Sequence, residues 1–172
     1  EQALRAEGTA PAVRLHIPRT LSRFGNQRAA DFLTEQLALD PSRLLRYKVL
    51  RGLGRLVADK DVRVDRDAIL AQMHRNLIEH VQALACWAPL DRHAATREHL
   101  SGQILLGLLE DKIRQSLERA FRLLHIAYRG EDIRGASLAL RSSDRLARSS
   151  AMEFLDALTS DARGVTAHER RE

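Results

Sequence analysis

Arginines are the residues of this sequence whose number and spacing best suit binding chemistry. The 172-residue chain has 28 Lys and Arg against 23 Asp and Glu, a net charge of +5, and only three of these bases are lysines. Within two pairs, the arginines are four residues apart, so each pair would lie on one helix face. Stacked in register, the pairs would form an anion-binding or partner-binding surface, extended by two further arginines. Its candidate residues are the pairs Arg19/Arg23 and Arg51/Arg55, together with Arg14 and Arg46.

Three kinds of partner suit such an arginine surface: an acidic protein segment, acidic lipid headgroups, and nucleic acid. Aromatic side chains that could stack on bases make up only 4% of the chain, and acids such as Asp31 and Glu35 lie among the bases. The pattern therefore favours a solvated surface or ion pairs within the fold, then a protein or lipid contact, with nucleic acid last.

Residues that could hold a metal or act as nucleophiles form no pattern known from enzymes. Metal ligands on one helix need a spacing of three or four, whereas His74 and His80 are six apart, as are His93 and His99. The alternative is one histidine from each pair meeting across a helical hairpin. Cys86 lies in an apolar segment without a paired base, which favours a buried structural thiol. We predict no catalytic residue, no metal and no cofactor, and hence a protein that is not an enzyme.

Length and composition exclude further classes. The length suggests one domain, expected over residues 1–160, followed by a polar tail over 161–172. One cysteine cannot build an intramolecular disulfide framework or a zinc site of several cysteines. The longest apolar run, residues 83–90, is too short to span a bilayer. The sequence begins at Glu1 rather than Met, so we expect a piece cut from a longer protein.

The elements that must position these residues are predicted to be helices throughout. Leu, Ala and Arg dominate, and glycine and proline occur where helices would start or stop. Pro18 should kink the first helix, Gly25 and Asn26 should end it, and Pro89 should break the fourth. The predicted helices are residues 11–24, 27–39, 41–57, 66–87, 91–128, 132–140 and 144–158, with a charged loop over 58–65.

Apolar stripes at helical spacing indicate which helix faces are buried. Each of the first three predicted helices and both long ones carries such a stripe. In chain order, the stripes are Leu15, Leu21 and Phe24; Ala30, Leu33 and Leu37; Leu45, Val49, Leu53 and Leu56; Leu70, Met73, Leu77, Val81 and Leu84; and Leu100, Ile104, Leu108, Ile113, Leu117, Phe121 and Leu124.

The first and third helices repeat one another at an offset of 32 residues, which aligns Leu21 with Leu53. The last helix aligns with the third at an offset of 102. An aspartate precedes two of these helices, where it can cap free amides and pair with an arginine of a neighbouring repeat. The pattern indicates helical hairpins stacked as a solenoid. The expected repeat-structural residues are Asp40, Arg46, Asp144 and Arg148.

Residues 13–24 (VRLHIPRTLSRF) and 45–56 (LRYKVLRGLGRL) resemble HEAT repeats. More narrowly, they resemble the HEAT region of bacterial membrane proteins of the ATP/ADP translocase-like, major-facilitator type. Residues 147–158 are similar to that family's closing helix. There Arg148, Ala151, Glu153, Leu155, Asp156 and Leu158 fit the family pattern, and Ser149 and Ser150 depart from it.

The resemblance implies an all-α fold of HEAT-like helical-hairpin repeats, a short α-solenoid. Repeats are expected at about 12–58 and 131–159, with a long central helical hairpin at about 66–128. The resemblance also implies a place at the cytoplasmic face of a larger, transporter-like inner-membrane protein. The expected function is non-catalytic: an interaction or scaffold domain that docks or couples protein domains or subunits. The alternative is a nucleic-acid-binding HEAT-like protein that uses the Arg-rich helix face.

Overall fold

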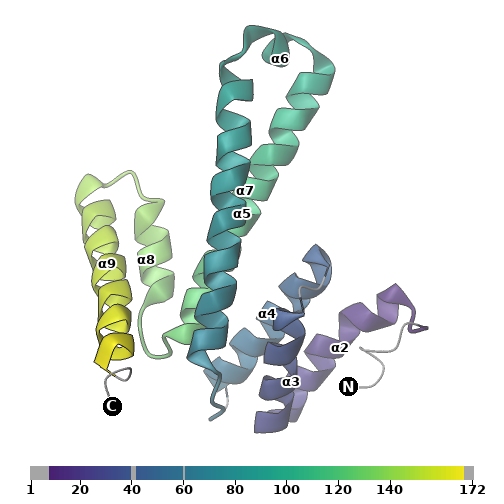
Figure 1. The fold of residues 1–172 in the computed structure, drawn as a ribbon, viewed down its shortest axis with the longest axis vertical. Coiled ribbons are helices and arrows are strands. Elements are labelled where there is room, and N and C mark those ends of the chain that lie inside the picture. The colour runs from purple at the N-terminus through teal and green to yellow at the C-terminus, as the bar shows by residue number, and fades with distance from the viewer. Residues whose placement is uncertain (1–7, 40–41, 60, 169–172) are drawn as a thin grey trace. The chain divides into compact units, whose positions relative to one another are not determined.

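A computed structural model describes residues 8–39, 42–59 and 61–168, with side chains as far as Ser160. Helices are the only regular elements of this described part, as the sequence predicted. The chain divides into two compact units, residues 1–129 and 130–172, where a single domain over 1–160 was expected. The helices of the first unit are α2 (Pro11–Phe24), α3 (Gln27–Ala38), α4 (Arg43–Asp59), α5 (Arg66–Arg92), α6 (Ala94–Glu98) and α7 (Leu100–Ala127); those of the second are α8 (Ile133–Leu140) and α9 (Arg145–His168) (Figure 1).

Helices α2, α3 and α4 pack against one another, and α2 runs parallel to α4. The Pro18 carbonyl oxygen lies 3.0 Å from the place that a Cβ would take at Gly52. One turn further along both helices, Arg55 Nη1 donates to Ser22 Oγ at 3.4 Å. Gly25 ends α2 in the left-handed conformation, as predicted. Helix α2 continues through Pro18, whose side chain is buried.

The main core lies between α3, α4 and the adjoining ends of α5 and α7. The predicted inward residues of α3 are all buried, and so are Val49, Leu53 and Leu56 of α4. The loop over residues 61–65 contributes Val62 to the core. Gln27 holds this loop in place, because its amide donates to the Arg63 carbonyl at 2.6 Å and accepts from the Arg63 N–H at 2.8 Å. The prediction that Phe24 is buried is wrong, since Phe24 is the last residue of α2 and is 67% exposed.

Helices α5 and α7 form the long hairpin that the sequence predicted, with α6 at its tip (Figure 1). Pro89 does not break α5, which continues to Arg92. Both Pro89 and Ala85, one turn earlier, are exposed, so water can bond the carbonyl that the proline leaves unpaired. The second long helix starts at Leu100 rather than 91. Gly102 permits this tight connection, because a Cβ there would collide with the Thr96 carbonyl oxygen.

The prediction that the apolar stripes of the long helices are buried is wrong for more than half of their members. Residues spaced by seven form the contact line of α5 instead: Ile69, Asn76 and Ala83 are its buried members. The predicted stripe lies about 100° further round the helix and is covered only where the core reaches it. Its exposed members are Leu77, Val81 and Leu84 on α5 and Leu100, Ile104, Leu108 and Leu117 on α7.

The second unit is a pair of helices. Asp132 Oδ1 accepts from the Gly135 N–H at 2.7 Å and caps α8. Asp144 Oδ1 accepts from the Leu146 N–H at 2.9 Å at the start of α9. The helix α9 extends to His168, ten residues beyond the predicted end at 158. Ile133, Ala136 and Ala151 are the buried apolar residues of this unit among the side chains described.

Candidate functional site

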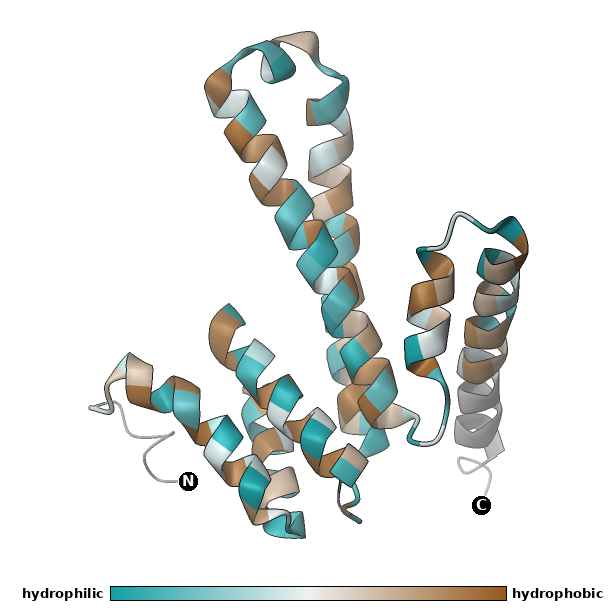
Figure 2. Cartoon of the chain, turned by 180° about the vertical axis from the view of Figure 1, so that it is seen from behind, coloured by the Kyte–Doolittle hydropathy of each residue, from teal (hydrophilic) through white to brown (hydrophobic). Residues whose placement is uncertain are grey.

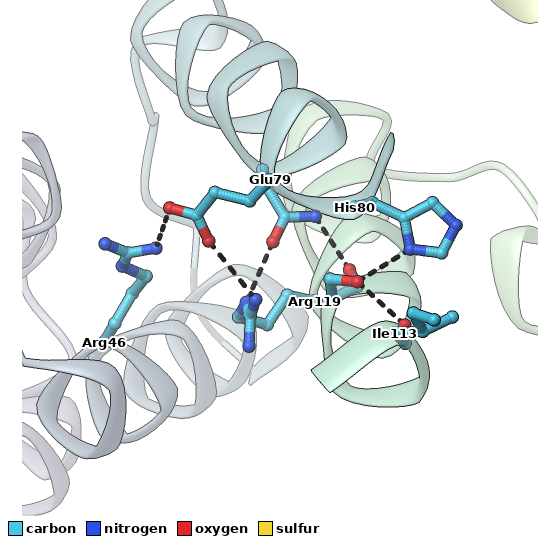
Figure 3. Close-up of polar contacts among 7 residues, drawn as sticks. Arg46, Glu79, His80, Ile113 and Arg119 are labelled. Carbon is cyan, nitrogen blue, oxygen red and sulfur yellow. Dashed lines mark hydrogen bonds and ion pairs between the residues drawn. The ribbon is translucent and has the colours of Figure 1, made fainter. Parts of the chain in front are cut away.

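A polar network crosses the contact between α4, α5 and α7 (Figure 3). Arg119 of α7 is 5% exposed, and its Nε donates to Asn76 Oδ1 of α5 at 2.8 Å. Asn76 Nδ2 donates to the Ser116 carbonyl at 2.7 Å, so both ends of this buried amide are bonded. Glu79 links the helices by pairing with Arg46 of α4 at 3.2 Å and with Arg119 at 3.6 Å. The network fixes the register of the hairpin against α4.

The same network includes His80 of α5. Its Nδ1 lies 2.7 Å from Ser116 Oγ, and that hydroxyl donates to the Ile113 carbonyl at 2.7 Å (Figure 3). The direction of donation between His80 and Ser116 depends on the histidine tautomer: when the hydroxyl donates to Ile113, His80 Nδ1–H is the donor. In that tautomer the serine oxygen is an acceptor, whereas activation as a nucleophile needs the opposite direction of donation.

The charge of Arg119 is held in an unfavourable environment. Burial lowers the pKa of its guanidinium, and the positive charges of Arg46 and Arg43 act in the same direction. Glu79 and Glu118 oppose the shift. Burial is thus the main cause of the lowered pKa, while two arginines and two glutamates around Arg119 act on it in opposite directions.

Two pockets share Arg119 as a wall. The larger, of ≈ 380 Å³, lies between α4 and α7, and the smaller, of ≈ 50 Å³, lies beside the Glu79 ion pairs. In the larger pocket, the Arg122 guanidinium pairs with Glu118 at 2.6 Å and lies 5.1 Å from the centre of the Tyr47 ring. The residues that line this larger pocket are Arg43, Leu44, Tyr47, Gln115, Glu118, Arg119 and Arg122.

The outer halves of the hairpin helices, residues 81–90 and 100–109, form a second candidate site, which we name the arms. Neither segment contains Asp, Glu, Lys or Arg, in a chain of which 30% is charged. Figure 2 shows hydrophobic residues along these turns and hydrophilic ones at the connection between them. The exposed large apolar side chains of the arms are Val81, Leu84, Leu100, Ile104, Leu105 and Leu108.

The candidate arginines of α2 and α4 lie in different environments. Arg19, Arg23 and Arg51 are exposed. Arg14 and Arg55 are half-buried, and Arg55 donates to Ser22. Arg46 is half-buried and pairs with Glu79 across to α5, so it belongs to the polar network rather than to an open face of α4.

Of the predicted repeat-structural residues, Asp144 and Arg148 both make contacts at the start of α9. Asp144 lies at the start of α9, where it accepts the Leu146 N–H. Arg148 donates to the carbonyls of Ser142 and Ser143 at 2.8 and 2.9 Å, and thus holds the turn before its own helix. Asp40, its predicted counterpart before α4, lies outside the described residues.

The prediction that Cys86 is buried is wrong, since it is exposed. It lies three residues after Ala83, about 60° round α5 from the contact line with α7. Of the described histidines, His80 is the one bonded in the network, and His16, His74, His93, His99 and His125 are exposed. Among the described residues, no group of three or more His, Cys, Asp or Glu side chains is placed to hold a metal ion.

Sequence reasoning missed Arg43, Arg119 and Arg122, which line the larger pocket, and Asn76 and Ser116, which complete the network. One signal was available. Asn76 lies midway between Ile69 and Ala83 at a spacing of seven, and a polar residue on such a contact line fixes pairing and register.

The chain matches no protein-family model, and comparisons with curated proteins and with solved structures give no match either. Across the part of the chain that the structure describes, no helix is both long and apolar enough to cross a membrane.

Proposed function

We propose that this chain is a non-catalytic helical interaction domain that docks a protein partner on the arms of the α5–α7 hairpin. The observation that carries the proposal is the combination of exposure and absent charge over residues 81–90 and 100–109. Large apolar side chains gathered on a surface mark binding sites, because water disfavours them there. Val81 and Leu108 are each 62% exposed and Leu100 is 72% exposed.

The distribution of charge along the hairpin favours a protein partner over a lipid bilayer. The tip beyond the arms is charged, and Asp91 pairs with Arg97 there at 2.8 Å. A hairpin that enters a bilayer tip first would have to bury this ion pair in hydrocarbon at high cost. Helices that lie on a membrane surface usually carry Lys and Arg beside their apolar face, and the arms have none. A protein partner that packs along the side of the arms would leave the Asp91–Arg97 ion pair in water and would need no Lys or Arg beside the apolar face.

The larger context of the proposal rests on the resemblance to HEAT regions. We propose HEAT-like hairpins for α2–α4 and for α8–α9, in a domain that couples parts of a transporter-like membrane protein at its cytoplasmic face. The parallel packing of α2 and α4, separated in sequence by about one repeat, supports this.

The test uses Cys86, the single cysteine, which is exposed within an arm. A benzophenone maleimide attached to Cys86 of this chain should crosslink to one defined protein segment when the labelled chain is irradiated in an extract of the cells that make it. Val81→Asp and Leu108→Glu should each abolish this crosslink, because a charge placed in an apolar contact must be desolvated. Ser149→Glu, an exposed substitution in the second unit, is the matched control. Crosslinks that persist in both arm variants, or the absence of any crosslink from the unsubstituted chain, would contradict the proposal.

A nucleic-acid partner is the second candidate, and the exposed arginines Arg19, Arg23 and Arg51 are the observation in its favour. Binding through these residues should weaken steeply as salt rises, since it would depend on counterion release. An electrophoretic mobility assay at low salt decides the matter. The absence of any shifted duplex or single strand there would rule this candidate out.

A further inference from the structure

The larger pocket has more basic than acidic side chains in its wall. It is bounded by the first turns of α4 on one side and by α7 on the other. Three of its seven wall residues are arginines, Arg43, Arg119 and Arg122, and one is an acid, Glu118. The walls therefore carry an excess of two positive charges. Arg119 is 5% exposed, so water screens its charge less than that of the exposed Arg43.

Two of the three wall arginines already have an acidic partner, and among the described residues Arg43 has none. Glu118 is engaged by Arg122, and Arg119 is held at the inner wall by Asn76 and Glu79. The Arg43 side chain forms no hydrogen bond or ion pair with any described residue. Its guanidinium is exposed at the rim of the pocket and free to turn toward a ligand.

The start of α4 adds to the same imbalance. A helix N-terminus carries partial positive charge and is stabilised by acids in its first turn. The first turn of α4 instead contains Arg43 and Arg46 and no acidic residue. Among the described residues, the start of α4 lacks the acid that helix N-termini favour, and departures from such a local rule occur at binding sites. An anion bound here would relieve the repulsion among the arginines and the helix end together.

We propose that this pocket binds the phosphomonoester of a small organic molecule. Its phosphate would lie between Arg43, Arg119 and Arg122, and its organic part against Leu44 and Tyr47. A phosphomonoester carries a charge near −2 at neutral pH, which matches the excess of the walls. One guanidinium group can donate two parallel hydrogen bonds to two oxygens of a phosphate. At ≈ 380 Å³, the pocket is within the range of small-molecule sites and larger than a bare phosphate requires.

The test titrates phenyl phosphate into the whole chain at constant ionic strength, followed by calorimetry and by the ³¹P resonance. Saturable binding is expected. Arg43→Gln should weaken it by about tenfold, the usual effect of losing one charged hydrogen bond. Arg51→Gln, which removes an exposed arginine from the same helix outside the pocket, should leave it unchanged. Glu118→Gln should tighten binding, since it removes the one acid of the pocket wall.

Melting temperatures give a second test, because Arg43→Gln should stabilise the chain without ligand but reduce the stabilisation that the ligand gives. Without ligand, Arg43→Gln should raise the melting temperature, because it removes a cation from the start of α4. With phenyl phosphate, the wild-type chain should gain stability, and Arg43→Gln should gain clearly less at the same ligand concentration. Binding that fails to saturate, or that falls equally in Arg51→Gln and Arg43→Gln, would overturn the proposal. An equal stabilisation of the wild-type chain and of Arg43→Gln by phenyl phosphate would overturn it too, because it would indicate a general salt effect.

Discussion

The inner and outer halves of the α5–α7 hairpin belong to the same two helices but are stabilised in different ways. The inner half packs against α3 and α4, with Ile69, Leu123 and Ile126 in the main core and Asn76 and Arg119 in a bonded network. In the arms, the helices pack on each other along a line that includes Ala83, while larger apolar residues face outward. The inner half is thus complete within this unit of the chain, and the arms keep apolar surface available for another surface to cover.

The largest difference between the halves should appear when a leucine is shortened in each. Leu53→Ala removes a fully buried side chain from α4, and should lower the free energy of unfolding by about 2–5 kcal/mol through lost burial and a cavity. Leu108→Ala in the arm should change it by less than about 0.5 kcal/mol, because Leu108 is 62% exposed. Urea unfolding followed by circular dichroism measures both. Equal losses would contradict the division into a packed half and an open one.

The network gives the next largest effect. Asn76→Ala leaves Arg119 Nε and the Ser116 carbonyl without their partner in a buried place, which should cost about 1–3 kcal/mol. Gln82→Ala, an exposed position of the arm on the same helix, is the control and should be nearly neutral. Fluorescence of Trp87, the single tryptophan, reports on the arm during the same unfolding experiment. A neutral Asn76→Ala would mean that the network does not stabilise the inner half.

The difference between the halves also explains which parts of the fold were predictable. Helix periodicity identified α2 with its observed ends and α3 to within one residue, and the inward residues of α3 and α4, because local spacing determines these. The same periodicity misplaced the contact face of the hairpin. Helices paired through small and polar residues such as Ala83 and Ser116 do not put their strongest apolar stripe in the interface.

The pocket could not be predicted for a related reason. Arg43 and Arg119 are 76 residues apart in sequence, and only the packing of α4 on α7 brings them to one wall. The regular i, i+4 arginine pairs drew attention because their spacing is visible along the chain. Arg46 belonged to that candidate set but pairs across to Glu79, a contact that the repeat pattern does not contain.

A smaller effect should follow from Glu79→Gln, which removes the carboxylate shared by Arg46 and Arg119. The Glu79 side chain is 37% exposed, so water screens the pairs and the expected loss is about 1 kcal/mol. The loss should shrink as salt is added. Glu110→Gln is the counterpart in the outer part of the hairpin, where the carboxylate accepts from Trp87 Nε1 at 3.2 Å, and it should change stability little. A salt-independent loss would indicate packing rather than charge.

The smallest contrast uses two glycines, one from each kind of region. Gly107 lies inside α7 in the arm, and a Cβ added there meets nothing within 4 Å. Gly107→Ala should therefore stabilise the chain by up to about 1 kcal/mol, the difference in helix propensity. Gly52 lies inside α4, where the same Cβ would approach the Pro18 carbonyl oxygen at 3.0 Å and Leu33 at 3.3 Å. Since α2 would have to move away, Gly52→Ala should destabilise despite the same gain in propensity. Opposite signs of the two changes in unfolding free energy would confirm that α2 packs closely on α4 while the arm remains open, and a gain at both positions would show that α2 is free to shift.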